Sequence, residues 1–245
     1  MPQASTLALV LSSSPLNEQD KLVALLTAER GVLKAVAPGA AKLRNRFGSL
    51  LELFTEGEFQ YYWRQDRELV TLSRGEIRKS FFPVVSAADN VFYFCLLAEI
   101  VLKSLAPGNR DTRIFKLLKA VLAGREAGMD MDWLTLYFLT WLLRSEGLLF
   151  NPRRCSNCGA RDLDQAWLRG DYRGLLCSSC RRGERLGLCR AELDYIAWTA
   201  SHAPGAAGAW AGHFAPAGLL RILTGKIEHH GEFSLQSRRY LPEFR

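Results

Sequence analysis

The stretch "LELFTEGEFQYYW", residues 51–63, alternates apolar and polar side chains almost without a break. Apolar side chains on one face are Leu51, Leu53, Phe59, Tyr61 and Trp63, and polar ones opposite are Glu52, Glu56, Glu58 and Gln60. A period of two is typical of a β-strand that buries one face. The stretch therefore predicts a half-buried strand.

Four more short apolar runs lie around this strand, at residues 6–11, 21–27, 32–37 and 69–73. The sequence "AERG" before the third predicts a tight turn in which Gly31 takes a positive φ. Five short strands with no long helical pattern between them predict a small closed barrel of the OB or SH3-like kind.

The period becomes helical after residue 82. Ser86 and Asp89 resemble a capping box before the apolar run 90–105, which we expect to end at Pro107-Gly108. Further helices are expected from the cap at Asp111-Thr112 to about residue 124, over 130–146 as a buried core helix, and over 191–201 and 216–229. The sequence "APGAAGAWAG", residues 203–212, is expected to be a loop. None of the apolar runs has the length of a membrane span.

A basic segment, "GAAKLRNRFG", connects two of the expected strands. It holds Lys42, Arg44 and Arg46 without a carboxylate, and we expect Phe47 to anchor it in the core. The net charge of +7, from 32 basic and 25 acidic residues, favours a polyanionic partner. The segment is the natural candidate for that contact, since a loop can carry cations without burying them.

Six cysteines accompany a first segment that has no basic region before its apolar run, so we expect a cytoplasmic protein with reduced thiols. Cys155 with Cys158 and Cys177 with Cys180 form two CxxC pairs separated by 18 residues. This spacing predicts one structural Zn²⁺ ion bound by four thiolates; redox-active pairs and an iron–sulfur cluster are the alternatives. Cys189 is a spare cysteine, and Cys95 is expected to be a small core residue.

The region around the four cysteines is rich in arginine. It contains four acids, Asp162, Asp164, Asp171 and Glu184, and eight arginines, at positions 153, 154, 161, 169, 173, 181, 182 and 185. Two readings are open: a nucleic-acid surface, or charges that merely solvate a small metal module with little core.

Motifs for catalysis do not occur in this chain. The four histidines all lie after residue 201, without HExxH spacing, and there is no GxSxG, Walker or GxGxxG motif. The pair His229-His230 is expected to end a helix. We therefore expect a binding protein and not an enzyme.

Several stretches, in this order, resemble the bacterial recombination mediator family RecO. They are "SPLNEQDKLVALLTAERGVLKAVAPGA", "KLRNRFGSLLELFT", the cysteine quartet of its zinc-bearing members, and "EHHGEFSLQSRRYL" near the end. The resemblance covers nearly the whole chain. It implies an α+β multidomain protein with an N-terminal OB-fold β-barrel over 1–82, an α-helical domain over 83–150 and 187–245, and a four-cysteine zinc finger inserted at 151–186.

The resemblance also implies a function. Such a protein binds single- and double-stranded DNA, anneals complementary strands and, with RecR, helps to load RecA onto DNA coated by single-strand-binding protein. It implies contact with the C-terminal tail of the single-strand-binding protein, a cytoplasmic and nucleoid-associated location, and no membrane.

Within this hypothesis, the candidate phosphate contacts are Lys34, Lys42, Arg44 and Arg46. Tyr62 is the preferred stacking residue, because Tyr61 and Trp63 share the apolar face with Leu51. Two rivals are a zinc-ribbon adaptor that binds only proteins and a nucleic-acid-processing enzyme whose site is assembled from scattered acids.

Overall fold

The computed structural model describes residues 2–64, 68–105 and 112–244. The chain forms two compact units, Met1–Leu122 and Ala123–Arg245. The division into a barrel, two helical parts and a zinc finger, with boundaries at residues 82, 150 and 186, stays a prediction.

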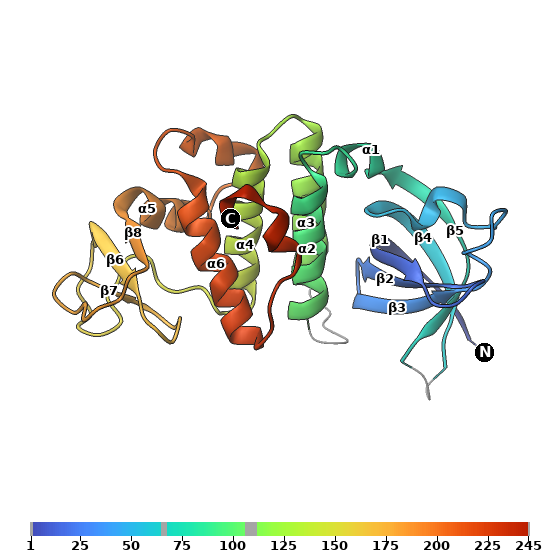
Figure 1. The fold of residues 1–245 in the computed structure, drawn as a ribbon, viewed down its shortest axis with the longest axis horizontal. Helices are drawn as coiled ribbons and strands as arrows, with labels where there is room; N and C mark the ends of the chain where they lie inside the picture. Colours follow the sequence, from blue (N-terminus) through green and yellow to red (C-terminus); the bar gives the residue numbers. More distant parts are fainter. Residues whose placement is uncertain (1, 65–67, 106–111, 245) are drawn as a thin grey trace. The chain divides into compact units, whose positions relative to one another are not determined.

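Unit 1 begins with a five-stranded closed barrel (Figure 1). The strands are β1 (Gln3–Pro15), β2 (Lys21–Thr27), β3 (Gly31–Ala37), β4 (Thr55–Tyr62) and β5 (Val70–Ser80). They close in the order β1-β2-β3-β5-β4, in which β3 and β5 are parallel and all other pairs antiparallel. This is the OB-like arrangement that the sequence predicts.

Alternate side chains of the strands fill the barrel. The core includes Val10, Leu25, Phe59, Tyr61 and Leu72. Leu50 packs against the backbone where β4 and β5 carry Gly57 and Gly75; a Cβ atom at either glycine would lie 2.8 Å from a methyl carbon of Leu50. The two glycines therefore allow this leucine to reach the strands, and Gly31 takes the expected positive φ of 66° between β2 and β3.

The strand predicted at residues 51–63 starts later, at Thr55. The preceding residues form the 3-10 helix η1 (Gly48–Leu51), and Phe54 has a positive φ of 55°. Phe59 and Tyr61 are buried as expected, but Glu56, which alternates with them on the polar face, is not exposed as expected: its exposed fraction is 6%. Its Oε1 atom lies 2.6 Å from the Nζ atom of Lys119, which compensates the buried charge.

Strand β5 is longer than its apolar run predicts. Its second half, "GEIRKS", is mostly exposed but pairs with β4 through the backbone. Exposed side chains carry no hydrophobic period, so the sequence pattern could not show this half.

Three helices follow the barrel strands: α1 (Phe82–Val85), α2 (Val91–Ser104) and α3 (Thr112–Glu126). The predicted capping box is wrong, since Ser86 follows the last residue of α1 and Asn90 precedes the first residue of α2. The Asn90 side chain instead donates a hydrogen bond of 2.6 Å to the carbonyl oxygen of Val84. The expected end at Pro107-Gly108 and the cap at Asp111 lie outside the described residues.

Unit 2 is built around α4 (Met131–Ser145), which is buried on nearly every side as predicted. Asp130 caps it by accepting hydrogen bonds from the backbone N–H groups of Asp132 and Trp133. The other elements are β6 (Gln165–Leu168), β7 (Leu175–Leu176), β8 (Gly187–Cys189), α5 (Arg190–Trp198), η2 (Pro204–Trp210), α6 (Pro216–Gly231), η3 (Ser237–Tyr240) and η4 (Pro242–Phe244).

The Ala/Gly-rich segment expected to be a loop forms the 3-10 helix η2. Ala207 is fully buried, and the ring of Trp210 lies 5.6 Å from the ring of Tyr195 in α5. These apolar contacts stabilise the segment, and its Ala/Gly-rich composition did not predict them. Among the helices that the structure describes, none combines the length and the apolar character needed to cross a membrane.

Candidate nucleic-acid interface and metal centre

Residues 39–48, here called the basic loop, connect β3 to η1 and are ordered by hydrogen bonds. The Asp20 carboxylate accepts from the N–H of Gly39 at 2.8 Å, and Ala41 N donates to the Gln19 carbonyl at 2.9 Å. Further along, the Asn45 side chain accepts from the N–H groups of Phe47 and Gly48, both at 3.0 Å. These hydrogen bonds therefore give the backbone of the loop a defined conformation.

Both ends of the basic loop are tied to the barrel. Phe47 is 4% exposed and belongs to the barrel core, as expected. At the other end, the hydrogen bond from the Gly39 backbone is the main cause that lowers the pKa of Asp20, followed by the bond from Asn17 and, more weakly, by the charge of Lys42. An ionised Asp20 thus holds the start of the loop at neutral pH.

The three predicted cations of the loop, Lys42, Arg44 and Arg46, are all exposed. Lys42 and Arg44 form no salt bridge in the part of the chain that the structure describes. The Arg46 guanidinium lies 5.0 Å from the centre of the Phe47 ring and 3.5 Å from the Leu72 carbonyl oxygen, so it is partly fixed. Lys34 is exposed too, but it lies outside the loop, on β3 opposite Ala24.

The aromatic residues at the end of β4 differ in exposure. Tyr61 is 1% exposed and part of the barrel core, whereas 37% of Tyr62 is exposed. Trp63 is half-buried against the same core. Of these three, Tyr62 has the ring that a ligand could reach, although its role stays a prediction.

The four predicted cysteine ligands converge in unit 2. All four Sγ atoms lie within 4.8 Å of one another, and the Sγ atoms of Cys158 and Cys177 are 3.7 Å apart. Zn–S bonds of about 2.3 Å in a tetrahedron place the sulfurs about 3.8 Å apart, so the donor set and its spacing fit Zn²⁺. The cluster could hold a metal ion, and four thiolates would leave no open position for catalysis.

Backbone geometry prepares Cys155 for ionisation. Burial opposes the thiolate, but the N–H groups of Cys158, Cys177 and Asn157 point at the sulfur and lower the pKa of Cys155 to about 6. Gly159, at a φ of 77°, turns the chain back so that its N–H donates to the Cys155 carbonyl oxygen.

Cys158 has the opposite environment. The Ala160 N–H favours its thiolate, yet hydrogen bonds with Cys180, Cys155 and Cys177 raise the pKa of Cys158 to about 11. Four adjacent thiols do not all ionise by themselves at neutral pH, and a divalent cation would stabilise the four charges.

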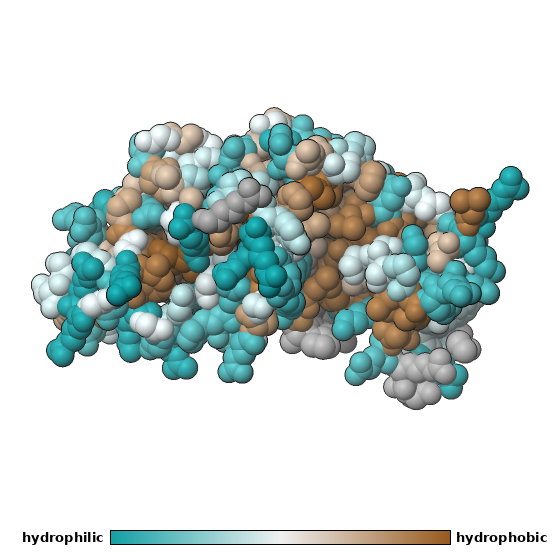
Figure 2. Space-filling view, in the orientation of Figure 1, coloured by the Kyte–Doolittle hydropathy of each residue, from teal (hydrophilic) through white to brown (hydrophobic). Residues whose placement is uncertain are grey.

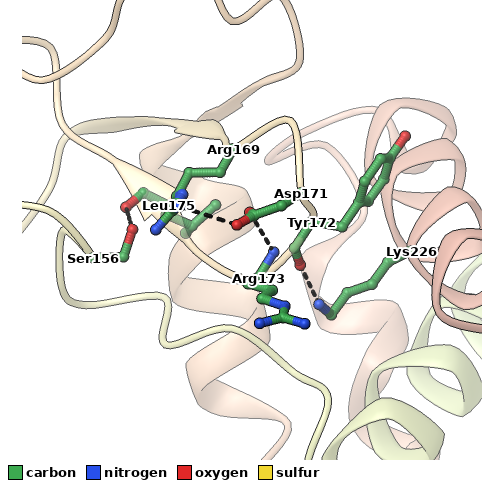
Figure 3. Close-up of polar contacts among 7 residues, drawn as sticks. All are labelled: Ser156, Arg169, Asp171, Tyr172, Arg173, Leu175 and Lys226. Carbon is green, nitrogen blue, oxygen red and sulfur yellow. Dashed lines mark hydrogen bonds and ion pairs between the residues drawn. The ribbon is translucent and has the colours of Figure 1, made fainter.

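The metal module, residues 151–186, is held by contacts within itself and by contacts to α6 (Figure 3). The Ser156 hydroxyl donates to the Leu175 carbonyl oxygen at 3.0 Å, next to Gly174, where a Cβ atom would lie 2.6 Å from the Ser156 Cβ. Lys226 reaches from α6, and its ammonium donates to the carbonyl oxygen of Tyr172. The Tyr172 ring also stacks on His229, with centroids 4.9 Å apart.

The module's arginines divide into engaged and exposed ones. Arg169 pairs with Asp171 at 3.0 Å, and Arg181 lies 4.6 Å above the Trp167 ring. Apart from Arg181, which is also exposed, the exposed arginines occupy positions 153, 154, 161, 173, 182 and 185. Hydrophilic side chains accordingly cover much of the module on the face drawn in Figure 2. Both readings of this charge, an anion contact and plain solvation, stay open.

A pocket of unit 2 was not predicted from the sequence. It has a volume of about 430 Å³ and apolar walls that include Leu149, Phe150 and Ile196, with Arg144 and Arg153 beside them. The Arg144 Nη2 atom donates to the Ile196 carbonyl at 2.8 Å, while Nη1 is buried with no hydrogen-bond partner among the described residues. Burial lowers the pKa of Arg144. Arg144, at the end of a largely apolar core helix, could have indicated a buried cation, but the sequence contains no signal for the pocket itself.

Comparisons with known proteins agree with this architecture. A family model described as "Recombination protein O N terminal" matches residues 1–81, and one described as "Recombination protein O C terminal" matches residues 86–239. Among similar curated proteins, the DNA repair protein RecO of Anaeromyxobacter dehalogenans (strain 2CP-1) is 30% identical, with 99% of this chain and 97% of the relative covered. Those of Koribacter versatilis (33%) and Clostridium novyi (30%) align over 71% and 72% of this chain, and over 71% and 69% of their own lengths. This chain belongs to the RecO family.

Proposed function

We propose that the chain is a non-catalytic mediator of recombinational DNA repair that binds single- and double-stranded DNA. Its relatives are named DNA repair proteins, which supports a role in repair and recombination. The observation that carries the DNA-binding part is the basic loop, which presents three exposed cations without a carboxylate on a turn tied to the barrel.

Phosphate groups are the ligands that this loop suits. Lys42 and Arg44 need not break a salt bridge to bind them, and Lys34 adds an exposed cation on β3. Contacts of this kind are independent of base sequence and weaken as salt rises, because binding releases condensed counterions. Tyr62 offers a ring face on which a base can stack.

Strand annealing follows from the same contacts. Two complementary strands repel each other through their phosphates, and cations that neutralise this charge lower the barrier to their encounter. A strand that is held at its backbone, with a base stacked on a ring by its face, keeps its pairing edges free. The protein thus needs no catalytic residue to anneal DNA.

The metal in this proposal is a single Zn²⁺ ion with a structural role. Cys155, Cys158, Cys177 and Cys180 would hold it, and the ion would supply the charge that keeps all four sulfurs ionised. By joining the two CxxC pairs, the ion would stabilise the module, in which β6 pairs with β7 and several arginines are exposed.

Protein partners complete the proposal. The mediator works with RecR to help load RecA onto DNA coated by single-strand-binding protein, in the cytoplasm and at the nucleoid. The apolar pocket beside Arg144 and Arg153 supports a contact with the tail of the single-strand-binding protein. An apolar side chain of the tail would pack on the apolar wall, and its terminal carboxylate would pair with the Arg144 guanidinium, of which Nη1 has no hydrogen-bond partner among the described residues.

Strand annealing on coated DNA tests the proposed function directly. Complementary single strands are coated with single-strand-binding protein, and duplex formation is followed with the wild type and with the Lys42→Ala, Arg44→Ala, Arg46→Ala variant. We expect the wild type to anneal the strands and the triple variant to be slower. Failure of the wild type to anneal them, together with no affinity for either DNA form at low salt, would favour the protein-only zinc-ribbon adaptor.

A further inference from the structure

Leu43, at the centre of the basic loop, is fully exposed. Its exposed fraction is 101%, the highest among the large apolar side chains that the structure describes, and the next is Tyr240 at 56%. Single exposed leucines are common on protein surfaces and need no explanation by themselves. The setting of this one, however, is unusual in two ways.

The first is that the backbone on both sides of Leu43 is held in place. Lys42 N donates to the Gly39 carbonyl at 3.2 Å, and the Asn45 side-chain amide donates to the Lys42 carbonyl at 3.1 Å. Asn45 at the same time accepts from Phe47 and Gly48. The exposure of Leu43 is therefore a property of a hydrogen-bonded turn, in which no neighbouring side chain shelters it.

The second is the order of side chains around Leu43, which has a cation on either side. Lys42 and Arg44 flank the leucine directly and Arg46 follows, all three exposed. A protein partner that covered Leu43 would have to desolvate these cations, and charged residues are depleted in the cores of protein interfaces. In a nucleic acid strand, by contrast, one phosphate links two stacked bases and a further phosphate lies on either side. The cations on both sides of Leu43 can therefore meet phosphates while the apolar side chain meets the bases.

We propose that Leu43 is a wedge that enters between two adjacent bases of a bound single strand and unstacks them while Lys42 and Arg44 hold the flanking phosphates. This inference rests on the proposed DNA-binding function and adds a residue that acts on the bases. Apolar side chains inserted at base steps are an established means of unstacking nucleic acids. Unstacking exposes the faces of the two bases and leaves their pairing edges free.

The test uses a single-stranded oligonucleotide with 2-aminopurine next to adenine, because stacking quenches the fluorescence of this base. Wild type, Leu43→Ala and the triple variant of Lys42, Arg44 and Arg46 are compared, with Leu16→Ala as a matched control, since Leu16 is an exposed leucine of the same unit. Affinity and its salt dependence are measured by anisotropy on the same strand. All of these substitutions replace exposed side chains, of which Arg46 also contacts Phe47 and the Leu72 carbonyl oxygen. We therefore expect the variants to fold.

We expect the wild type and Leu16→Ala to raise the fluorescence and Leu43→Ala to abolish most of the rise. The affinity of Leu43→Ala should fall by about ten- to a hundredfold, since only one side chain's apolar burial is lost, and the salt slope should not change.

Equal fluorescence for Leu43→Ala and wild type, with DNA binding intact, overturns the wedge but leaves the proposed function standing. If the triple variant has the same slope of log K against log salt as the wild type, the loop does not bind the phosphates, and the wedge is overturned as well. If Leu43→Ala weakens binding to single-strand-binding protein or RecR while the fluorescence is unaffected, the leucine belongs to a protein interface and the wedge is overturned.

Discussion

The basic loop and the metal module are both cationic surfaces, but they are held in place by different means. The loop is fixed by backbone hydrogen bonds and by Phe47 in a barrel core. The module has short strands and a cysteine quartet that could hold a metal ion. The comparison indicates that similar charge can be supported by a hydrophobic core in one region and by a cysteine cluster that could hold a metal ion in the other, so we expect that the two regions can be disrupted separately.

Loss of the metal ligands has the largest expected effect. Structural Zn²⁺ contributes about 10–16 kcal/mol in small zinc domains, so Cys177→Ser should unfold residues 151–186 and abolish metal binding. Limited proteolysis would show new cleavage sites within the module, and the protein's zinc content would fall. The barrel should stay resistant, and proteolysis that spreads equally into residues 2–64 would contradict the separation of the two regions. Cys189→Ser, at an exposed cysteine outside the quartet, is the control.

Phe47→Ala should damage the loop without touching the module. Removal of a buried phenylalanine costs about 3–5 kcal/mol, and the end of the basic loop loses its anchor. Chemical denaturation should show a less stable barrel, while the zinc content stays that of the wild type. Loss of zinc in this variant would mean that the regions are coupled.

Asn45→Ala should have a smaller effect on the same loop. The N–H groups of Phe47 and Gly48 lose their acceptor, which costs about 1 kcal/mol for each hydrogen bond. Hydrogen exchange at these two amides should speed up, with little change in the strands. Unchanged exchange would show that the side chain does not order the turn.

The contact between α6 and the module should give the smallest effect, visible in its pH dependence. Lys226 is 5% exposed, and burial lowers its pKa, so the folded state binds fewer protons than the unfolded state as the pH approaches 10.5 from below. Stability linked to Lys226 therefore increases with pH through this window. The free energy of unfolding of the wild type minus that of Lys226→Met should increase as pH rises. A decrease of this difference with pH would contradict the assignment.

Local patterns predicted the parts of the structure that depend on near neighbours. The period of two identified the buried face of Phe59 and Tyr61, and the CxxC spacing identified the four sulfurs that converge. Phe47 could be recognised as an anchor because an apolar residue ends a charged run next to a strand.

Features that depend on distant residues could not be predicted. Glu56 is buried because Lys119 reaches it from a helix 63 positions later, and a strand pattern contains no information about that partner. The second half of β5 pairs through its backbone, which leaves no apolar signal. The pocket beside Arg144 needs α5 and the segment after α4 to meet, and only the tertiary structure shows this.

The salt dependence of DNA binding tests the central claim most directly. Binding of a single strand is measured over a range of salt concentrations for the wild type, the Lys42→Ala, Arg44→Ala, Arg46→Ala variant and Arg78→Ala, a control cation of unit 1 that is already paired with Glu58 at 2.6 Å. Each phosphate contact contributes about 0.7 to the slope of log K against log salt, so the triple variant should flatten the slope by about 2 and the control should change it little. An unchanged slope in the triple variant, with the wild type still bound to DNA, would contradict the assignment of the basic loop as the phosphate-binding surface.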